Sequence, residues 1–538
     1  MQTHFSDQQR ADPLIQSAEA ELRKCVHCGF CTATCPTYRL TGDELESPRG
    51  RIVLIQDLLE TGAAPTALTV GHLDRCLSCL SCESTCPSGV SYRRLIDPAR
   101  ELIEARHRRP ALDRALRAAL AWLLTGRRRF AAALYLGRGF RPLLHLAGRA
   151  WKPLAALARM VPEAPPAGRA ITPGIYRAEG RELRRVLLVA GCVQPALAPA
   201  IDAAALHLLR RHGCTVVVPA AGGGCCGALP HHLGKAQRAQ ELARRNLAVW
   251  REHLDGDGAV DAVLMTASGC GSQLRDYAYL LPDDPTAAAL AGRVRDLSQL
   301  LLDLHTESPL RVIAERSAGI AVAWQSPCSL QHGMAEKRAP IALLESCGFA
   351  VRQPQNPHLC CGSAGTYNLL QPEFAARLGA DKAEALRATG ATVAVSANIG
   401  CLTQLRAHLA EGECVRRLFL LCRRTDVGAC FQDALRRKAV AGVDRRLYPV
   451  AGRVLGPGQG ACRKGDEARE DQIPLGRPDR PAYGRRLASG HHPRRPACHD
   501  ADDSRDRSSV RPERLGQRGR PGIQGDDQLS VAFRLCGG

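Results

Sequence analysis

The pattern of apolar and polar positions changes along the chain. Between residues 181 and 410, short apolar runs alternate with longer segments in which apolar residues recur at helical spacing. The apolar runs are VLLVAG at 186–191, TVVVP at 215–219, AVLMTA at 262–267, IAVAW at 320–324, FAVRQ at 349–353 and TVAVSA at 392–397. This alternation predicts α/β units with largely parallel sheets.

The flanking regions follow other patterns. Before residue 107, segments such as RIVLIQDLLE (51–60) place apolar residues at helical spacing, which predicts a helical N-terminal region. Residues 107–180 are rich in Arg, Ala, Leu and Pro, and they predict short amphipathic helices followed by a Pro-rich linker at 161–174. From residue 411 onward no periodicity is sustained.

The α/β region contains an internal duplication marked by cysteines. The apolar runs lead to Cys192, Cys225 with Cys226, and Cys270 in the first copy, and to Cys328, Cys360 with Cys361, and Cys401 in the second. Equivalent cysteines are 136, 135 and 131 residues apart. Because ligands of parallel sheets bind at the carboxyl ends of strands, we predict that each copy gathers its cysteines at one sheet edge.

These patterns predict a multidomain α plus α/β protein of five regions. They are a helical region at 1–106, a helical connector with its linker at 107–180, cysteine-rich domains at 181–310 and 311–412, and an irregular tail at 413–538. With 538 residues, the chain is long enough for several hydrophobic cores.

The N-terminal region carries two cysteine motifs of one form. They read CVHCGFCTATCP from Cys25 and CLSCLSCESTCP from Cys76, and both fit C-x2-C-x2-C-x3-C-P. In two-cluster ferredoxins, the fourth cysteine of such a motif binds the cluster held by the other motif. The spacing therefore predicts two [4Fe–4S] clusters, one on Cys25, Cys28, Cys31 and Cys86, the other on Cys76, Cys79, Cys82 and Cys35.

Zinc is the alternative occupant of these cysteines. Zinc prefers four ligands from paired C-x2-C units, whereas two runs of four closely spaced cysteines followed by Pro favour iron–sulfur clusters. His27, inside the first motif, could tune a cluster by hydrogen bonding to sulfur or be an ordinary loop residue.

The adjacent cysteines of each α/β copy, followed in both cases by glycine, admit several kinds of chemistry. Such a pair can ligate a metal, form a strained disulfide, carry out redox chemistry, or simply be two small buried apolar residues. Repetition after matching strands favours a redox or cluster site in each copy, on Cys192, Cys225, Cys226 and Cys270 and on Cys328, Cys360, Cys361 and Cys401. The sequence leaves open whether a further cluster or metal binds there.

Composition and charge limit the remaining function classes. The formal net charge is +20, but residues 415–538 hold 26 Lys and Arg against 15 Asp and Glu, so the signal for nucleic acid belongs mostly to the tail. Aromatic residues are only 4% of the chain, and we expect no specific nucleic-acid binding. The N-terminus shows no secretory signal and no long apolar run occurs, so we expect a cytoplasmic protein.

Any contact with a membrane would therefore be peripheral. Residues 127–160 alternate basic and apolar residues at helical spacing. Such a segment could lie on an anionic membrane surface, against a partner, or on the protein's own core.

Together these motifs resemble the iron–sulfur subunits of glycolate oxidase (glycolate dehydrogenase), within a wider group that includes lactate-utilisation and anaerobic glycerol-3-phosphate dehydrogenase iron–sulfur proteins. The resemblance rests on CVHCGFCTATCPTY, SPRGRIVLIQDLLE, CLSCLSCESTCPSGV, GGGCCGALPHHLG, SGCG, HLCCGSAGTYNLLQPE and SANIGC. It implies an α-helical ferredoxin domain and two cysteine-rich domains of the heterodisulfide-reductase type.

The resemblance also implies a role. FAD-containing dehydrogenase subunits would oxidise glycolate to glyoxylate, and this chain would relay electrons from their FAD to quinone or another acceptor at the inner face of the cell membrane. No substrate site and no catalytic residue are expected on this chain. The alternatives are an iron–sulfur subunit of a lactate-utilisation or glycerol-3-phosphate dehydrogenase complex, and a stand-alone thiol redox enzyme like heterodisulfide reductase.

The sequence departs from this family at two places. In the heterodisulfide-reductase group the cysteine-rich motif often ends C-x-x-C, but here Cys270 and Cys401 lack the second cysteine, so the extra thiolate for a noncubane cluster is missing. Beyond residue 411 the chain turns Arg-, Gly- and Pro-rich, as a disordered basic arm or a reading-frame shift would produce. A frame shift would make the cysteines there incidental: Cys414, Cys422, Cys430, Cys462, Cys498 and Cys536.

Overall fold

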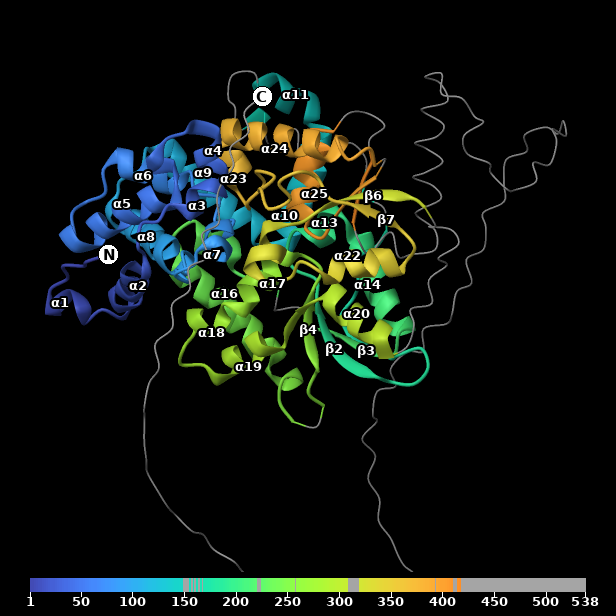
Figure 1. Cartoon of the computed structure of the whole chain (residues 1–538). Coiled ribbons are helices and arrows are strands. Elements are labelled where there is room, and N and C mark those ends of the chain that lie inside the picture. Colours follow the sequence, from blue (N-terminus) through green and yellow to red (C-terminus); the bar gives the residue numbers. More distant parts are fainter. Residues whose placement is uncertain are drawn as a thin grey trace, which may run out of the picture. The chain divides into compact units, whose positions relative to one another are not determined.

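The computed structural model describes residues 1–148, 168–219, 224–256, 258–307, 319–391, 393–409 and 414–417, with a few positions between 154 and 166. All of them belong to one unit, Met1–Val450. In chain order they form a helical N-terminal region, a helical connector and two α/β regions (Figure 1), which confirms the predicted order of helical and α/β parts. The predicted tail lies outside the described residues from residue 418 onward.

Short helices around a small apolar core make up the N-terminal region. They are α1 Asp7–Arg10, α2 Pro13–Lys24, α3 Phe30–Ala33, α4 Pro36–Thr41, η1 Glu44–Glu46, α5 Pro48–Thr61, α6 Ala67–Asp74, α7 Ser81–Thr85 and α8 Arg93–Arg106. Ser47 caps the N-terminus of α5, and its hydroxyl accepts a hydrogen bond from the Gly50 N–H at 3.0 Å. Leu22, Ile55 and Leu95 lie fully buried in the core.

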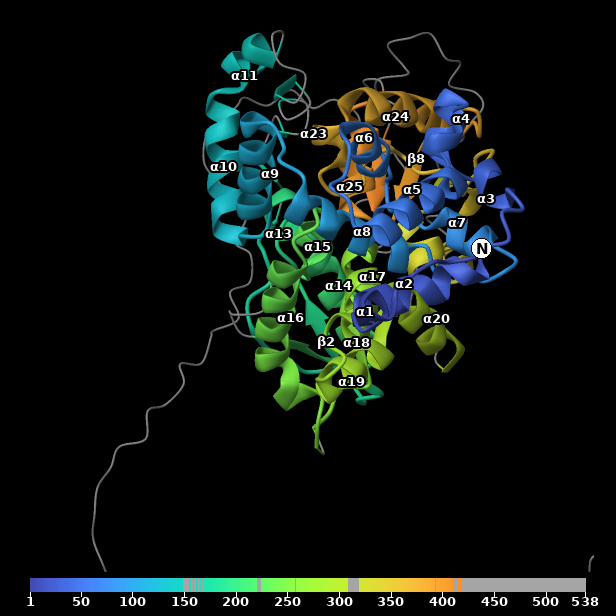
Figure 2. The ribbon, with the colours of Figure 1, turned by 90° about the vertical axis from the view of Figure 1, so that its left-hand side faces the viewer.

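The connector consists of three helices, α9 Ala111–Leu124, α10 Arg127–Gly139 and α11 Arg141–Gly148. Figure 2 shows α9 beside α10, against which it packs, and α11 at the end of α10. Leu120, Phe130 and Leu134 are buried on their inner faces. In the described parts of the chain, every helix is too short or too polar to span a bilayer.

The first α/β region has a five-stranded sheet in the order β1-β3-β2-β4-β5, parallel except for β1. The strands are β1 Gly174–Tyr176, β2 Arg184–Val189, β3 Cys214–Val218, β4 Ala262–Met265 and β5 Val294–Asp296. The helices are α13 Gln194–Leu197, α14 Pro199–Arg211, α15 Ala228–His232, α16 Ala236–Trp250, η2 Arg251–His253, α17 Ser268–Arg275, α18 Tyr277–Leu280, α19 Pro285–Arg293 and α20 Leu297–Glu307. The strands β2, β3 and β4 form the centre of the buried core, and the helices on both faces of the sheet supply the other core residues.

The second α/β region has a four-stranded parallel sheet in the order β7-β6-β8-β9. The strands are β6 Ala321–Gln325, β7 Ala350–Arg352, β8 Val393–Ser396 and β9 Cys414–Arg417. The helices are the π-helical turn η3 Ser329–Gly333, α22 Ala339–Ser346, α23 Tyr367–Leu370, α24 Pro372–Arg387 and α25 Ile399–Arg406.

The two sheets repeat one topology. The order β3-β2-β4-β5 in the first corresponds to β7-β6-β8-β9 in the second, and all six predicted strands are present in largely parallel sheets. The prediction that residues from 413 onward form only an irregular tail is wrong for 414–417, because β9 pairs with β8, with Cys414 opposite Val393. The sequence CVRR is too short and too polar to show a strand period, so only the pairing reveals it.

Candidate functional site

Each N-terminal cysteine motif is a tight loop followed by a short helix, α3 in the first motif and α7 in the second. The first motif starts at Cys25, the cap residue at the C-terminus of α2, and ends at Cys35, the N-cap of α4. Pro36 then occupies the first position of α4, where its missing N–H would have no intrahelical partner anyway. In the second motif, Cys86 caps the C-terminus of α7.

Both motifs use left-handed backbone at the same two positions. His27 and Gly29 have φ of 56° and 82° in the first motif. Ser78 and Leu80 have φ of 48° and 61° in the second. A residue with a side chain is strained in this region by about 1–3 kcal/mol, so the loops are held in a shape that turns successive cysteines toward one point. His27 takes part through its backbone in this way, and its role in tuning a cluster stays a prediction.

The structure gathers the eight N-terminal cysteines, all unpaired thiols, into two sets. One small cavity is lined by the first set, Cys25, Cys28, Cys31 and Cys86. A second small cavity is lined by the second set, Cys35, Cys76, Cys79 and Cys82. In each set the fourth cysteine of one motif lies with the first three of the other. Cys82 borders both cavities, so the two sets are neighbours.

The two sets differ in their access to solvent. In the first set Cys28 is exposed, and it is flanked by Val26 and Phe30 with 67% and 61% of their surface exposed. In the second set Cys35, Cys76 and Cys82 are buried. The first set therefore opens onto the surface, and the second faces the interior.

A buried ion network lies behind the second set. Arg51 is fully buried and donates to Glu46 at 2.6 Å and to Thr37 at 3.1 Å, with its Nη1 3.9 Å from Cys35 Sγ. His72 Nδ1 lies 2.6 Å from the same carboxylate. Burial alone would lower the pKa of Arg51, but the nearby cysteines and Glu46 raise it. Sequence analysis missed this cation, because Arg51 begins the segment RIVLIQDLLE and nothing in that segment indicates that Glu46 and Cys35 will lie beside it.

In the first α/β region, four cysteines converge beyond the carboxyl ends of β2, β3 and β4. Hydrogen bonds between side chains link Cys192 to Cys225, Cys225 to Cys226, and Cys226 to Cys270. Cys270 lies in the first turn of α17, where the helix dipole favours negative charge. We call these residues the first quartet.

The second α/β region repeats this arrangement. Side-chain hydrogen bonds link Cys328 to Cys360, Cys360 to Cys361, and Cys361 to Cys401. Cys401 lies in the first turn of α25, as Cys270 does in α17. These residues form the second quartet.

Each quartet favours one anionic sulfur. Hydrogen bonds from Cys192 and Cys226 hold the pKa of Cys225 well below its usual range. In the second quartet, Cys361 has its pKa lowered in the same way by hydrogen bonds from the thiols on either side of it. A thiolate surrounded by thiols can bind a metal or attack a disulfide, because the thiolate is the reactive form of cysteine.

A single cavity of about 550 Å³ lies between the two quartets. All eight quartet cysteines line it, together with Cys76 and Cys79 of the second N-terminal set. Its remaining wall is mostly apolar and includes Leu120, Phe130 and Leu134 of the connector. The sequence placed each quartet at its own sheet edge but did not indicate that the two share one cavity.

The contact between the α/β regions explains why the quartets face each other. Ser268, just before Cys270, contacts Ser329, just after Cys328, through their hydroxyls at 2.8 Å. The side-chain amide of Asn398 donates to both hydroxyls, at 3.2 and 3.3 Å. The residues beside the cysteines therefore form part of the junction.

The second N-terminal set packs directly against the second quartet. Leu77, Cys328 and Cys360 share a buried apolar cluster, and Cys79 packs against it. The Tyr367 hydroxyl donates to the carbonyl of Arg75 at 3.2 Å. Burial, and then the negative charge of Cys328, raise the pKa of Cys79, which reflects how close the two sulfurs lie.

Glycine follows the cysteine pair in both copies for the same physical reason. Gly227 has φ +87°, and a Cβ there would lie 3.1 Å from the Ala239 carbonyl oxygen. Gly362 has φ +81°, and its Cβ would lie 2.7 Å from the Ala375 carbonyl oxygen. Only glycine allows this backbone to approach the following helix.

Family comparisons assign both kinds of cysteine motif. The model of the 4Fe-4S dicluster domain matches residues 21–90. The model of the cysteine-rich domain matches twice, at residues 186–275 and 322–406. The two matches to the second model coincide with the duplication seen in the sheets.

Curated relatives share most of the described chain. The glycolate oxidase iron–sulfur subunit of Escherichia coli (strain K12) is 40% identical over 405 residues, which cover 75% of this chain and 95% of that protein. The probable glycolate oxidase iron–sulfur subunit of Bacillus subtilis (strain 168) is 34% identical and covers 72% of this chain and 89% of that protein. Lactate utilization protein A of Shouchella clausii (strain KSM-K16) is 25% identical over 42% of this chain and 91% of its own length.

Proposed function

Because the chain belongs to the family of glycolate oxidase iron–sulfur subunits, we propose that it is the electron-transfer subunit of a complex that oxidises glycolate to glyoxylate. FAD-containing partner subunits carry out the oxidation, and this chain passes the electrons to quinone or another acceptor. The observation that supports this role is the spatial order of the cysteines. The first N-terminal set is partly exposed, the second set is mostly buried, and the second set packs against the second quartet. The lactate-utilisation alternative has only distant matches, which cover part of the chain.

The N-terminal cysteines suit two [4Fe–4S] clusters. The first set, Cys25, Cys28, Cys31 and Cys86, would hold one cluster, and the second set, Cys35, Cys76, Cys79 and Cys82, would hold the other. Two groups of four free thiols, each lining its own cavity, support this assignment. Bound there, the clusters supply one-electron transfer, and the buried Arg51 offsets negative charge beside the second set.

The quartets of the α/β regions are proposed as a further redox site. Cys192, Cys225, Cys226 and Cys270, and likewise Cys328, Cys360, Cys361 and Cys401, could each hold a cluster or metal through four sulfurs. Their convergence on one cavity supports a site where electrons leave the protein.

Iron and acid-labile sulfide, measured on the full chain purified without oxygen, test the assignment. About eight of each per chain would mean two clusters, and clearly more would mean that the quartets hold another. The variant Cys28→Ala should lose iron, whereas Cys214→Ala, a buried thiol of β3 outside every set, should not. Well under eight of each, with zinc present, would refute the proposal.

We propose that electrons enter at the first set. Cys28 is its exposed member, and the apolar side chains of Val26 and Phe30 beside it suit a partner surface. The double variant Val26→Asp, Phe30→Asp should slow reduction by the glycolate-reduced flavin subunits at least tenfold and leave reduction by dithionite unchanged. Leu68→Asp, an equally exposed change on α6, is the control. Equal slowing in both variants would place the contact elsewhere.

Peripheral membrane contact is proposed for the connector helices. Tyr135 is exposed on α10, Phe140 between α10 and α11, and Leu143 on α11, and Arg127 and Arg128 are exposed at the start of α10. Apolar and aromatic side chains next to basic ones are typical of helices that lie on anionic lipid, here the inner face of the cell membrane. Binding to vesicles with anionic lipid, and its release by salt, would support this contact, and equal binding to neutral vesicles would contradict the role of the arginines.

A thiol redox enzyme is the second candidate function, supported by the two favoured thiolates that face one cavity. It predicts that the isolated chain reduces a disulfide substrate. Activity that persists in both Cys225→Ala and Cys361→Ala would exclude the quartets as its site.

A further inference from the structure

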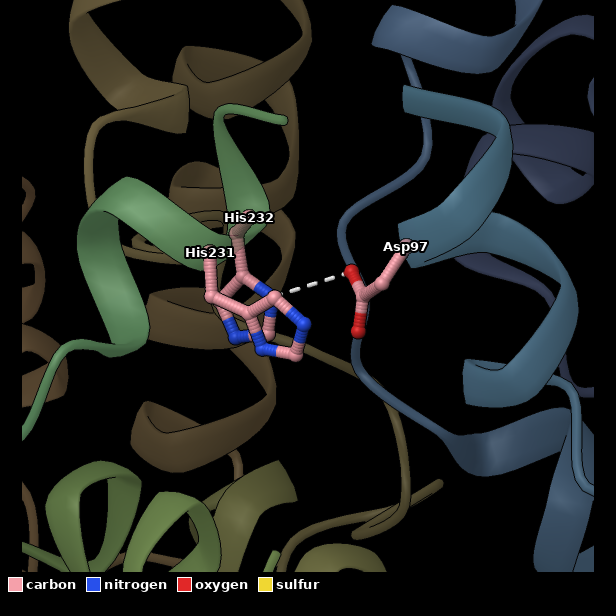
Figure 3. A group of neighbouring side chains, drawn as sticks. All are labelled: Asp97, His231 and His232. Atoms are coloured by element: carbon pink, nitrogen blue, oxygen red, sulfur yellow. Dashed lines mark hydrogen bonds and ion pairs between the residues drawn. The ribbon is translucent and has the colours of Figure 1, made fainter. Parts of the chain in front are cut away.

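A solvent-facing ion pair is built into the wall of the 550 Å³ cavity. His232 at the end of α15 and Asp97 on α8 both line this cavity, and His232 Nδ1 lies 3.2 Å from Asp97 Oδ1. Figure 3 shows the two histidine side chains extending from α15 toward Asp97, with the dashed line joining His232 to the carboxylate. The His232 side chain is 44% exposed and that of Asp97 only 8%, so the pair connects solvent to the interior.

The neighbouring His231 lies next to this pair. Its ring stacks on that of His232 with centroids 5.9 Å apart, and its Nδ1 lies 3.5 Å from the Gln273 side-chain oxygen. Ligand atoms of Asp97, His231 and His232 lie within 4.8 Å of one another, but Arg100 is 4.0 Å from Asp97 and places positive charge there. The surroundings therefore favour an ion pair over a bound cation.

Asp97 is kept ionised by its neighbours. Burial alone would raise its pKa, but His232, His231 and Arg100 outweigh burial and hold the pKa below its usual range. Arg100 also donates to Ser78 Oγ at 2.7 Å and to the Cys76 carbonyl at 2.6 Å. The same guanidinium thus connects the ion pair to the loop that carries the second N-terminal set.

The other charged groups on this wall are paired with guanidinium groups, which do not exchange protons near neutral pH. Asp74 is paired with Arg109 and Arg117, and Asp276 with Arg93 and Arg94. Around the histidines, α8 also carries Glu101 near His231 and Glu104, which pairs with Lys235. Among the described residues that line the cavity, His232 is the single histidine.

We propose that His232 delivers protons from solvent to a quinone bound in this cavity, and that Asp97 positions its ring and stabilises its charged form. The inference rests on the proposed function, in which glycolate oxidation supplies two electrons per turnover. Each quinone then takes up two electrons and two protons, and its two carbonyl oxygens become hydroxyls. In each transfer an imidazolium N–H bond breaks, an O–H bond forms, and solvent returns the proton to the exposed ring.

The cavity suits this acceptor. A mostly apolar lining with a few polar groups at one place is typical of sites for ring-shaped apolar ligands. The connector side chains Leu120, Phe130 and Leu134 form its apolar wall, on the helices that we propose contact the membrane where quinone resides. His232 is the one imidazole among the described residues of the lining, and imidazole is the usual proton-transfer group of proteins.

The test compares two acceptors in the assembled complex with glycolate as the electron donor. Ferricyanide takes electrons without protons, and a short-chain quinone needs both. We expect His232→Ala to lower quinone reduction at least tenfold with ferricyanide reduction unchanged, and added imidazole to restore the quinone rate. Asp97→Asn should give a smaller loss. His253→Gln, which removes another histidine next to a carboxylate, is the control.

A second readout does not depend on turnover. Binding of a redox-inert quinone analogue, followed by fluorescence quenching, should be unchanged in His232→Ala. A quinone rate unaffected by His232→Ala, or lost binding of the analogue, would overturn the proton-delivery role. Failure of the wild-type complex to reduce ferricyanide with glycolate would instead refute the proposed function.

Discussion

The two cysteine-rich copies share their topology and their quartets, yet they differ in charge beside them. Gly227 lies against Ala239 and Gly362 against Ala375, and with these contacts aligned, Asn246 of α16 corresponds to Lys382 of α24. The Asn246 amide donates to the Cys225 carbonyl at 2.9 Å and to the Tyr277 hydroxyl at 2.8 Å.

Lys382 places a cation at the position where the first copy has a neutral amide. It is only 4% exposed, and its Nζ lies 3.4 Å from the carbonyl oxygens of Asn356 and Pro357. Burial lowers the pKa of Lys382, and the four cysteines of the second quartet oppose that shift. The charge therefore acts on the whole quartet.

The two copies therefore share the positions of the cysteine sulfurs but differ in the charge of the side chain beside them. A buried cation stabilises added negative charge, so the second quartet should accept electrons more readily than the first. It is also the quartet that packs against Cys79 of the second N-terminal set. The copy nearest the incoming electrons is thus the one with the extra positive charge.

The largest effect is expected at the glycine that follows the cysteine pair in both copies. Gly362→Ala should destabilise the protein by about 2–5 kcal/mol, because it adds a left-handed residue and an overpacked Cβ. Gly227→Ala should have a smaller effect, since its Cβ would lie 3.1 Å from the carbonyl oxygen instead of 2.7 Å. Urea unfolding of both variants measures this order, and an equal loss would show that backbone conformation alone decides it.

An intermediate effect is expected at Lys382, the cation that distinguishes the second copy from the first. Lys382→Met removes the cation, so thiolates of the second quartet lose stabilisation and the pKa of Cys361 should rise. Alkylation of the metal-free protein across a pH series, read by mass spectrometry, should show Cys361 reacting more slowly at neutral pH. Cys225 in the first quartet is the internal control, and Lys382→Arg should retain the wild-type profile. A shift of similar size at Cys225 would contradict a local effect.

The smallest expected effect concerns the junction between the copies. Asn398 caps α25 by accepting the Gly400 N–H at 2.8 Å, whereas Ala267 at the equivalent position of α17 makes no such bond. Asn398→Ala should therefore lower the free energy of unfolding by about 1–2 kcal/mol. Asn398→Asp keeps the capping oxygen but loses the N–H donor to Ser268 and Ser329. Thermal unfolding of both variants therefore separates the capping of α25 from the hydrogen bonds across the junction. No loss in either variant would show that the junction is held by packing alone.

Much of the fold could be predicted from the sequence, because the signals are local. Six apolar runs marked six strands, and the repeated cysteines marked the duplication. The strand β9 was missed because four residues with two arginines show no period of their own. It belongs to the sheet because β8 offers a partner edge.

Arg51 and the pair His232–Asp97 were missed for a related reason. The role of each depends on what lies beside it in the folded protein. Arg51 lies beside Glu46, and His232 lies beside the cavity. A lone Arg in an apolar helix, or a His at the end of a short one, carries no sequence signal of what will face it.

By itself the sequence predicted which thiols lie together, since cysteines separated by two or three intervening residues must lie close and repeated strand ends bring matching residues to one sheet edge. Only the tertiary structure decided that both quartets open into one cavity, that the second N-terminal set lies against the second of them, and that an ion pair joins this cavity to solvent. The spacing of residues along the chain limits only local geometry. Which surfaces distant in the sequence face each other depends on how whole helices and sheets pack.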